Sequence, residues 1–354
     1  MLYQTGNQHG GDVYGGGITL DFSANTNPLG TPPGVLEAVC RALPRLHRYP
    51  DPYCRRLVQA IAAHEQVPAS YVLCGNGAAD LIYAYCAALR PRTAAEPAPT
   101  FAEYGLGLAQ VGCRVAPYFL HQAENFDVDE GFLPFLEEKK PEVVFLCTPN
   151  NPTGRLLPLP LLEQILQGCA AWGARVFLDE CFLDLTEDGV SAKSLLTAHP
   201  ELLILKAFTK SYGMAGIRLG YCLCADNALL RRMAAASQPW NVSSLAQSAG
   251  VAVLAERDFL QRTLSLVRTE RRWLTDNLTA LGFWVCPSHA NYLLFRGPLG
   301  LREGLLQQGI AIRGCGNYNG LGDGWYRIAV RPHGENEALI TAIRQFCKEK
   351  ALWQ

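Results

Sequence analysis

Residues 143–154 read VVFLCTPNNPTG, five consecutive apolar residues followed by a polar turn that contains two prolines. A short apolar run without alternation is typical of a strand that is buried on both faces, as in parallel sheets. Because Asn-Pro pairs commonly begin turns, the simplest interpretation of residues 150–152 is a turn after the strand. The alternative is that an asparagine amide is held at the carboxyl edge of the sheet, where ligands bind in such folds.

The pattern of strand and helix continues on both sides of this stretch. Helical spacing of apolar residues predicts helices over 78–89 and 161–172. Alternation of strands with helices predicts a mostly parallel sheet that is covered on both faces. The other strands of this sheet are predicted by short apolar runs at 71–74, 175–178, 202–205 and 219–222.

The C-terminal third has a different texture. Beyond residue 240, long helical segments are predicted over 246–281 and 335–349. The short strands predicted between them lie at 292–295, 310–312 and 326–330. This part is therefore interpreted as a smaller α+β domain.

The chain has 354 residues, more than one hydrophobic core usually supports. We expect three parts: an N-terminal arm over 1–33 that joins the small domain, a large domain over 34–240 and a small domain over 241–354. The arm is rich in Gly, Asn and Pro, which predicts irregular structure and not a packed element. The 49% hydrophobic content predicts a large core, an interface between subunits, or both.

Composition also limits the function. Lys and Arg number 31 against 32 Asp and Glu, so binding of nucleic acid by bulk charge is not expected. The apolar runs are far shorter than the roughly 18 residues of a membrane span, and no signal peptide is expected. The 13 cysteines are scattered, with no C-x-x-C pair. This pattern favours reduced, buried cysteines in a cytoplasmic protein, without a bound metal.

Charged side chains follow two of the predicted strands. Asp179 and Glu180 come directly after the run 175–178, and Lys210 follows the run 202–205. Taken alone, each is more simply interpreted as a solvated loop residue. The functional interpretation is that a carboxylate points into a site at the sheet edge, where it needs a cationic partner. A desolvated lysine at the same edge would have a lowered pKa, which suits a nucleophile.

Two further segments are suited to binding an anion. Arg218 lies between Gly216 and Gly220, and residues 75–78 (GNGA) join a predicted strand to a predicted helix. Backbone amides at a helix N-terminus can hold a phosphate group. Residues 75–78 do not begin a dinucleotide fingerprint, because Asp80 occupies the position of the third glycine. A lysine, an aspartate, an asparagine, an arginine and a phosphate loop are together the groups that pyridoxal phosphate needs.

These segments, in this order, resemble the fold-type I pyridoxal-phosphate enzymes, in the aminotransferase class that contains histidinol-phosphate aminotransferase. The resemblance runs through nearly the whole chain and rests on residues 150–154, Asp179-Glu180 and Thr209-Lys210 followed by Arg218. It implies a large domain with a mostly parallel seven-stranded sheet between helices, and a smaller α+β C-terminal domain. It also implies a homodimer with shared active sites, in which Tyr49 reaches the cofactor phosphate of the neighbouring subunit.

The resemblance also implies roles for individual residues. Lys210 would bind the cofactor as a Schiff base, Asp179 would contact the pyridine nitrogen, and Asn151 would contact the ring oxygen. Phe101 matches the aromatic residue that stacks on the ring. The cofactor phosphate would be contacted by Gly77, Ala78, Thr209 and Arg218.

Within the class, several stretches are similar to decarboxylases of a phosphorylated amino acid, among them residues 9–12 (HGGD), 21–30 (DFSANTNPLG) and 101–105 (FAEYG). This similarity implies decarboxylation of L-threonine O-3-phosphate to (R)-1-amino-2-propanol phosphate for cobalamin biosynthesis. A solvated role is an equally good interpretation for His9 and Arg331. The residues expected to bind the small phosphorylated substrate are His9, Asn25, Asn151, Arg313, Arg327 and Arg331.

Two positions depart from the wider aminotransferase pattern. Phe182 stands where many members have a tyrosine that donates to the ring oxygen, so Asn151 would hold that oxygen alone. The decarboxylases also carry Phe at this position, so the departure favours them. Ala207 replaces the usual Ser or Thr three residues before the lysine. The loss of one phosphate ligand predicts weaker retention of the cofactor.

The residues leave three functions open. The first is decarboxylation, in which the bond from Cα to the carboxylate is held perpendicular to the cofactor ring. The second is transamination of histidinol phosphate or a related amine with 2-oxoglutarate, in which the Cα–H bond takes that position. The third is a protein of this fold that binds pyridoxal phosphate or an amino acid without turnover. Serine phosphate also remains open as a substrate.

Overall fold

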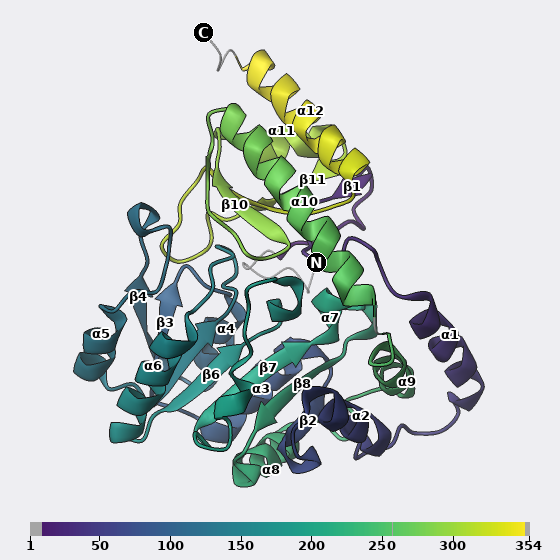
Figure 1. Cartoon of the computed structure of the whole chain (residues 1–354), viewed down its shortest axis with the longest axis vertical. Helices are drawn as coiled ribbons and strands as arrows, with labels where there is room; N and C mark the ends of the chain where they lie inside the picture. The colour runs from purple at the N-terminus through teal and green to yellow at the C-terminus, as the bar shows by residue number, and fades with distance from the viewer. Residues whose placement is uncertain (1–8, 257, 351–354) are drawn as a thin grey trace.

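The computed structural model describes residues 9–256 and 258–350. Figure 1 shows two parts: a large sheet with helices on both faces, and a smaller sheet with two long helices above it. The helices are α1 Pro33–Ala42, α2 Arg55–Glu65, α3 Gly77–Leu89, α4 Glu103–Gln110, α5 Phe132–Lys139, α6 Leu159–Ala171, α7 Phe208–Ser211, α8 Asn227–Ala236, α9 Ser244–Val253, α10 Phe259–Ala280, α11 Leu301–Gln307 and α12 His333–Glu349. None of these helices has the length and apolarity to cross a membrane.

The large sheet has seven strands in the order β2-β8-β7-β6-β5-β3-β4. Strand β8 is antiparallel to both of its neighbours, and the other pairs are parallel. The predicted sheet, mostly parallel and covered on both faces, is thus confirmed. The strands are β2 Val72–Gly75, β3 Thr93–Ala98, β4 Arg114–Phe119, β5 Val143–Cys147, β6 Arg175–Asp179, β7 Leu202–Ala207 and β8 Gly220–Cys224.

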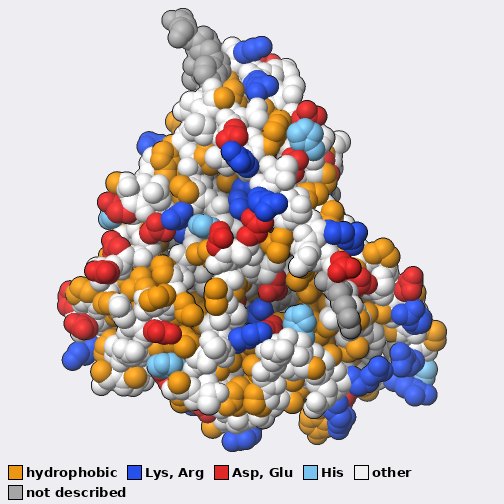
Figure 2. All heavy atoms as spheres, viewed as in Figure 1, with side chains coloured by type: hydrophobic (Ala, Val, Ile, Leu, Met, Phe, Trp, Pro, Cys, Tyr) orange, Lys and Arg blue, Asp and Glu red, His pale blue; other side chains and the backbone are white. Residues whose placement is uncertain are grey.

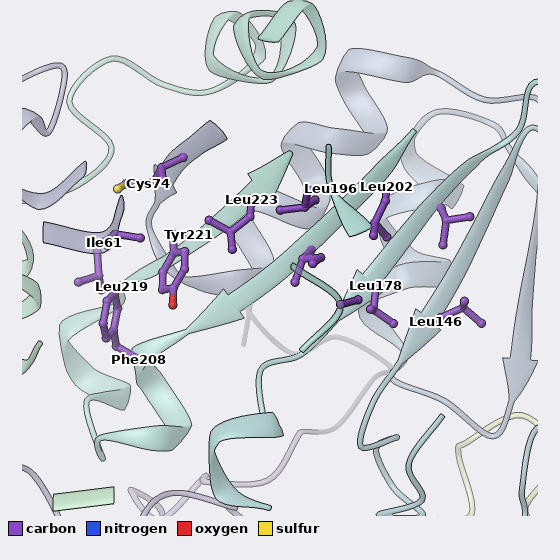
Figure 3. Close-up of a cluster of buried hydrophobic side chains, with 14 of the residues drawn as sticks. Ile61, Cys74, Leu146, Leu178, Leu196, Leu202, Phe208, Leu219, Tyr221 and Leu223 are labelled. Atoms are coloured by element: carbon purple, nitrogen blue, oxygen red, sulfur yellow. The ribbon is translucent and has the colours of Figure 1, made fainter. Parts of the chain in front are cut away.

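Side chains of each central strand alternate between the two faces of this sheet. On one face, Leu178, Ile204 and Leu223 pack beneath α1, α2, α5, α6 and α9, and Figure 3 shows this cluster. On the other face, Phe177 and Leu205 pack beneath α3, α4 and α8. The continuous apolar runs at 143–147 and 202–205 are explained by burial on both sides.

The small domain contains an antiparallel sheet in the order β12-β13-β10-β9. Helices α10 and α12 pack side by side above it, green and yellow in Figure 1. Its strands are β9 Trp284–Val285, β10 Tyr292–Arg296, β11 Ile310–Ala311, β12 Arg313–Gly314 and β13 Trp325–Ala329, of which β11 pairs with the arm. Helix α9, which lies beyond residue 240, packs against α1 and α2. The predicted domain boundaries at 33 and 240 stay predictions.

The N-terminal arm corrects one expectation. Strand β1, Leu20–Asp21, pairs in parallel with β11. Beyond it, Phe22 is fully buried in the small-domain core, and Asn25 and Asn27 are also buried. The prediction of an irregular, unpacked arm is therefore wrong for residues 20–27. The composition misled because Asn and Gly give no apolar periodicity, whereas Phe22 packs into the small-domain core and Asn27 donates hydrogen bonds to Ser211 and Thr263.

Candidate active site

A cavity of about 420 Å³ opens at the carboxyl ends of β5, β6 and β7. The arm and the small domain form its other walls, which is where ligands are expected in open α/β sheets. Eleven of the predicted site residues line this one space. The lining residues are His9, Gly10, Ser23, Ala24, Asn25, Ala78, Ala79, Phe101, Glu103, Tyr104, Cys147, Asn151, Asp179, Cys181, Phe182, Ala207, Thr209, Lys210, Arg218, Arg313, Tyr318 and Arg327.

Lys210 lies in α7, the single turn of helix that follows β7. Burial, together with the positive charges of Arg327 and Arg218, lowers the pKa of its ammonium group to about 8. Its Nζ lies 5.8 Å from the centre of the Phe182 ring. About a tenth of the amine is therefore neutral at pH 7, far more than at the usual lysine pKa, and the neutral form is the one a nucleophile requires.

Asp179 is the last residue of β6, and its carboxylate is held at both oxygens. The Tyr104 hydroxyl donates to Oδ2 at 2.6 Å, and the backbone N–H of Cys181 donates to Oδ1 at 2.8 Å. Burial raises the pKa of Asp179, while these hydrogen bonds and the charge of Lys210 act in the opposite direction. The carboxylate is thus a fixed acceptor that would be stabilised further by a cationic ring nitrogen.

Asn151 lies in the turn after β5, in hydrogen-bonding contact with Arg327 of β13. The guanidinium of Arg327 donates through Nη1 to the Asn151 Oδ1, and the Tyr318 hydroxyl lies 3.4 Å from the same oxygen. Nη2 of Arg327 donates to the backbone carbonyl of Ser23 at 2.9 Å. With its oxygen held in this way, Asn151 has its amide Nδ2 available to donate to a ligand oxygen.

The segment from Gly75 to Ala78 joins the last residue of β2 to the first turn of α3. Gly77 has φ +84°, and a Cβ at this position would lie 2.8 Å from Nη2 of Arg218. Only glycine therefore fits beneath the guanidinium. Arg218 itself adopts a left-handed backbone, with φ 58°. A guanidinium packed against the first amides of a thirteen-residue helix is a suitable site for a phosphate.

These residues fit pyridoxal phosphate by the chemistry of the donor set. A lysine with a lowered pKa, a fixed carboxylate, an amide donor and a phosphate cradle face one cavity. A model of the family described as aminotransferase class I and II matches residues 18–346.

The chain belongs to aminotransferase class I and II.

The enzymes of this family depend on pyridoxal phosphate. The chain is 40% identical over 329 residues to the threonine-phosphate decarboxylase of Salmonella typhimurium, which covers 92% of this chain and 90% of that relative. It is also similar to the structure of histidinol-phosphate aminotransferase from Clostridium acetobutylicum, with a TM-score of 0.87, 28% identity and coverage of 93% and 99%. L-threonine-O-3-phosphate decarboxylase from Porphyromonas gingivalis gives a TM-score of 0.83, 25% identity and the same coverage.

The arm and the small domain supply the other predicted residues of the cavity. His9 forms an ion pair with Glu103, with Nε2 and Oε1 2.9 Å apart, and its ring lies 6.4 Å from that of Phe101. With its amide oxygen turned towards β13, Asn25 accepts from Nε of Arg327 at 3.1 Å. Arg313 is buried, and Asn317 accepts from its Nη2 at 2.8 Å.

Three predicted residues do not line the cavity: Gly77, which packs against Arg218, and the two residues Arg331 and Tyr49. Arg331 pairs with Glu335, its Nε 2.9 Å from the carboxylate, so its role with substrate stays a prediction. Tyr49 is 78% exposed and stacks on the ring of Trp240, with centroids 4.6 Å apart. Its predicted contact with a neighbouring subunit likewise stays a prediction.

Sequence reasoning missed several residues of the cavity, and Tyr104 is the most informative. It lies three positions after Phe101, and the two rings pack edge to face with their centres 5.6 Å apart. That spacing was the available signal for a second aromatic residue at the site. Its hydrogen bond to Asp179 joins residues 75 positions apart, which no local pattern predicts. The other missed residues are Ser23, Glu103, Cys147, Cys181 and Tyr318.

Proposed function

We propose that this enzyme decarboxylates L-threonine O-3-phosphate to (R)-1-amino-2-propanol phosphate, a step in cobalamin biosynthesis. The observation that carries the proposal is the 40% identity to the Salmonella typhimurium decarboxylase over 92% of the chain. The phenylalanine at position 182 agrees with it, because that ring packs edge-on against Tyr292 at 4.9 Å and offers no hydroxyl to the cofactor.

The residues at the sheet edge would hold pyridoxal phosphate. Lys210 would bind it covalently and Asp179 would accept a hydrogen bond from its ring nitrogen. When bound, the cofactor supplies an electron sink for the pair released as the Cα–carboxylate bond breaks. The remaining contacts would come from Asn151 and Phe101 to the ring, and from Gly77, Ala78, Thr209 and Arg218 to the phosphate.

The opposite end of the cavity would orient the substrate. Arg327 and Arg313 are buried cations, and each can form paired hydrogen bonds with a carboxylate or a phosphate. His9 and Asn25 add donors from the arm. Anion pockets on this side decide which bond to Cα stands perpendicular to the ring, and hence which bond breaks. Lys210, with a pKa of about 8, can return a proton to Cα after loss of CO₂.

The test is a comparison of products from the purified holoenzyme. Threonine phosphate should release CO₂ and an amine phosphate without any oxo acid, and unphosphorylated threonine should react far more slowly. A strict requirement for 2-oxoglutarate would replace the proposal with an aminotransferase acting on histidinol phosphate or a related amine, which the fold similarity at a TM-score of 0.87 supports as the second candidate. A shift in the visible absorbance of the holoenzyme on addition of threonine phosphate, without product, would instead indicate a protein that binds without turnover.

We also propose a homodimer in which Tyr49 reaches the cofactor phosphate of the neighbouring subunit. Figure 2 shows basic side chains gathered over α1 and α2, at the lower right of that view. Exposed apolar side chains accompany them in the same segment and beside it, and a second copy would cover them. They are Leu36, Leu43, Leu46, Tyr49, Tyr53 and Trp240. Sedimentation equilibrium of the holoenzyme should give twice the mass of the chain, and a monomer would contradict the proposal.

A cytoplasmic location is the remaining proposal. All thirteen cysteines lie in the described part of the chain, and each is a free thiol. Eleven of them are buried, where they pack as small apolar residues. Cell fractionation of a tagged chain would test the location.

A further inference from the structure

A network of charged side chains lies behind β7, on the face opposite the cavity. Nζ of Lys206 lies 3.0 Å from Oε1 of Glu65 in α2 and 3.1 Å from Oδ1 of Asp184. Asp184 belongs to the short 3₁₀ turn Leu183–Leu185 that follows β6. Lys193 and the hydroxyl of Tyr221 complete the network through Glu65, at 3.0 Å and 2.5 Å.

Lys206 and Glu65, the pair at the centre of this network, are both charged. Burial alone would lower the pKa of Lys206, but the carboxylates of Asp184 and Glu65 raise it well above its usual value. Burial would raise the pKa of Glu65, whereas Lys206 and the hydrogen bond from Tyr221 bring it down to about 2. Because apolar side chains often stabilise an interior as well as an ion pair does, such a network suggests a positional role.

Asp184 connects this network to the turn that carries Lys210. Its Oδ2 accepts a hydrogen bond from the Ser211 hydroxyl at 3.0 Å, while its Oδ1 faces Lys206. Ser211 is fully buried and follows Lys210 directly in the chain. The carboxylate therefore bridges a fixed ammonium group on β7 and a hydroxyl on α7.

Helix α7 needs such external contacts because it has only four residues. An isolated helix of that length is unstable in water. The backbone N–H of Asn27 donates to the Lys210 carbonyl at 3.0 Å, and its side-chain amide donates to the Ser211 carbonyl at 2.7 Å. Figure 3 shows Phe208, the first residue of α7, near Tyr221, and the two ring centres lie 5.3 Å apart.

We propose that Asp184 is a positioning residue for Lys210: held by Lys206, it fixes α7 through Ser211 and thereby sets where the Lys210 amine meets the cofactor. The proposal rests on the proposed role of Lys210 in binding pyridoxal phosphate. It does not depend on which reaction follows.

The test removes the bridge and leaves the network intact. Ser211→Ala deletes only the hydroxyl that donates a hydrogen bond to Asp184. Ser191→Ala is the matched control, because the Ser191 hydroxyl also donates to a buried carboxylate, that of Glu180, at 2.6 Å, but it does not contact α7. Asp184→Asn is a second variant that keeps an acceptor for Ser211 and removes the charge that faces Lys206.

Three measurements compare these variants. The first is hydrogen exchange of the peptide covering 208–212 in the enzyme without cofactor. The second is the visible circular dichroism of bound pyridoxal phosphate, which reports the orientation of the cofactor. The third is kcat and KM with threonine phosphate. In Ser211→Ala we expect faster exchange, altered dichroism and a fall in kcat of about 10-fold to 100-fold at nearly unchanged KM.

The control separates positioning from general loosening of the structure. Ser191→Ala should resemble the wild type in exchange over 208–212, in dichroism and in kcat, and Asp184→Asn should lie between the two. If Ser211→Ala matches Ser191→Ala in exchange and dichroism, the positioning role is wrong. If the wild type fails to release CO₂ from threonine phosphate, the proposed function is wrong, but the exchange and dichroism comparison still decides the role of Asp184.

Discussion

Two buried lysines lie four residues apart on β7 and α7, and the two faces of the sheet give them opposite chemistry. Lys206 faces Glu65 of α2 and Asp184 of the turn after β6, and these carboxylates raise its pKa and keep it charged. Lys210 faces the cavity, where burial and two arginines lower its pKa to about 8. The same residue type thus becomes a structural cation on one face and a nucleophile on the other. The difference comes from the neighbouring charges, since both side chains are removed from water.

The largest expected effect comes from removal of the cavity lysine. Lys210→Ala should lower the rate of CO₂ release from threonine phosphate by several orders of magnitude, because the covalent attachment to the cofactor is lost. The visible absorbance that depends on this attachment should also disappear. Thermal stability without cofactor should be unchanged or slightly higher, since the change removes a buried cation. Persistence of the absorbance would show that another residue binds the cofactor.

Removal of the other lysine should act on stability instead. Lys206→Met leaves the buried Glu65 and the half-buried Asp184 without their central cation, which should lower the free energy of unfolding by about 3 to 5 kcal/mol. Urea unfolding followed by circular dichroism measures this change. The remaining folded enzyme should still bind pyridoxal phosphate. The comparison between the two lysines fails if Lys206→Met is as stable as the wild type.

The pH dependence of cofactor binding separates the two lysines without mutation. Only the neutral amine of Lys210 attacks the aldehyde, so the rate of reconstitution should rise with pH up to its pKa of about 8 and then level off. Between pH 6 and pH 8 the rise should be about 50-fold for a single group with this pKa. Lys206 stays protonated throughout this range. Stopped-flow absorbance provides the rates, and a flat profile would contradict the lowered pKa of Lys210.

The smallest effects are expected for two tyrosines that donate hydrogen bonds to carboxylates, one on each face of the large sheet. Tyr104→Phe removes the hydrogen bond to Asp179 and should lower kcat by about tenfold. Tyr221→Phe removes the hydrogen bond to Glu65 and should leave kcat unchanged. Each should lower the free energy of unfolding by about 1 to 2 kcal/mol, measured in urea.

A third buried tyrosine provides the control for this pair. Tyr85 packs edge-on against Phe177, and its hydroxyl has no hydrogen-bond partner among the described residues. Tyr85→Phe should therefore be neutral or slightly stabilising, with wild-type kcat. Equal kcat in the Tyr104 and Tyr85 variants would show that the hydrogen bond from Tyr104 to Asp179 does not contribute to catalysis.

The strands that carry the site were predictable because their signal is local. The runs at 143–147, 176–178 and 202–205 are continuously apolar, which follows from burial on both faces of the sheet. Strands β3 and β4 gave no such signal, since TAAEPA and RVAPYF each contain a proline, and β3 also contains a glutamate. Strand β4 lies at the edge of the sheet, where proline needs no partner for an absent N–H.

The sequence by itself determined the residue types at the strand ends, and hence Lys210, Asp179 and Asn151 as a set suited to pyridoxal phosphate. Spacing and residue chemistry suffice there because the carboxyl ends of neighbouring strands converge at one edge. Only the tertiary structure decided which of two nearby lysines has a raised pKa and which a lowered one, because Glu65 lies 141 residues before Lys206 and Asp184 lies 22 before it. The pKa of a buried group depends on the charges that folding brings within a few ångströms, and these are not encoded in its own segment of the chain.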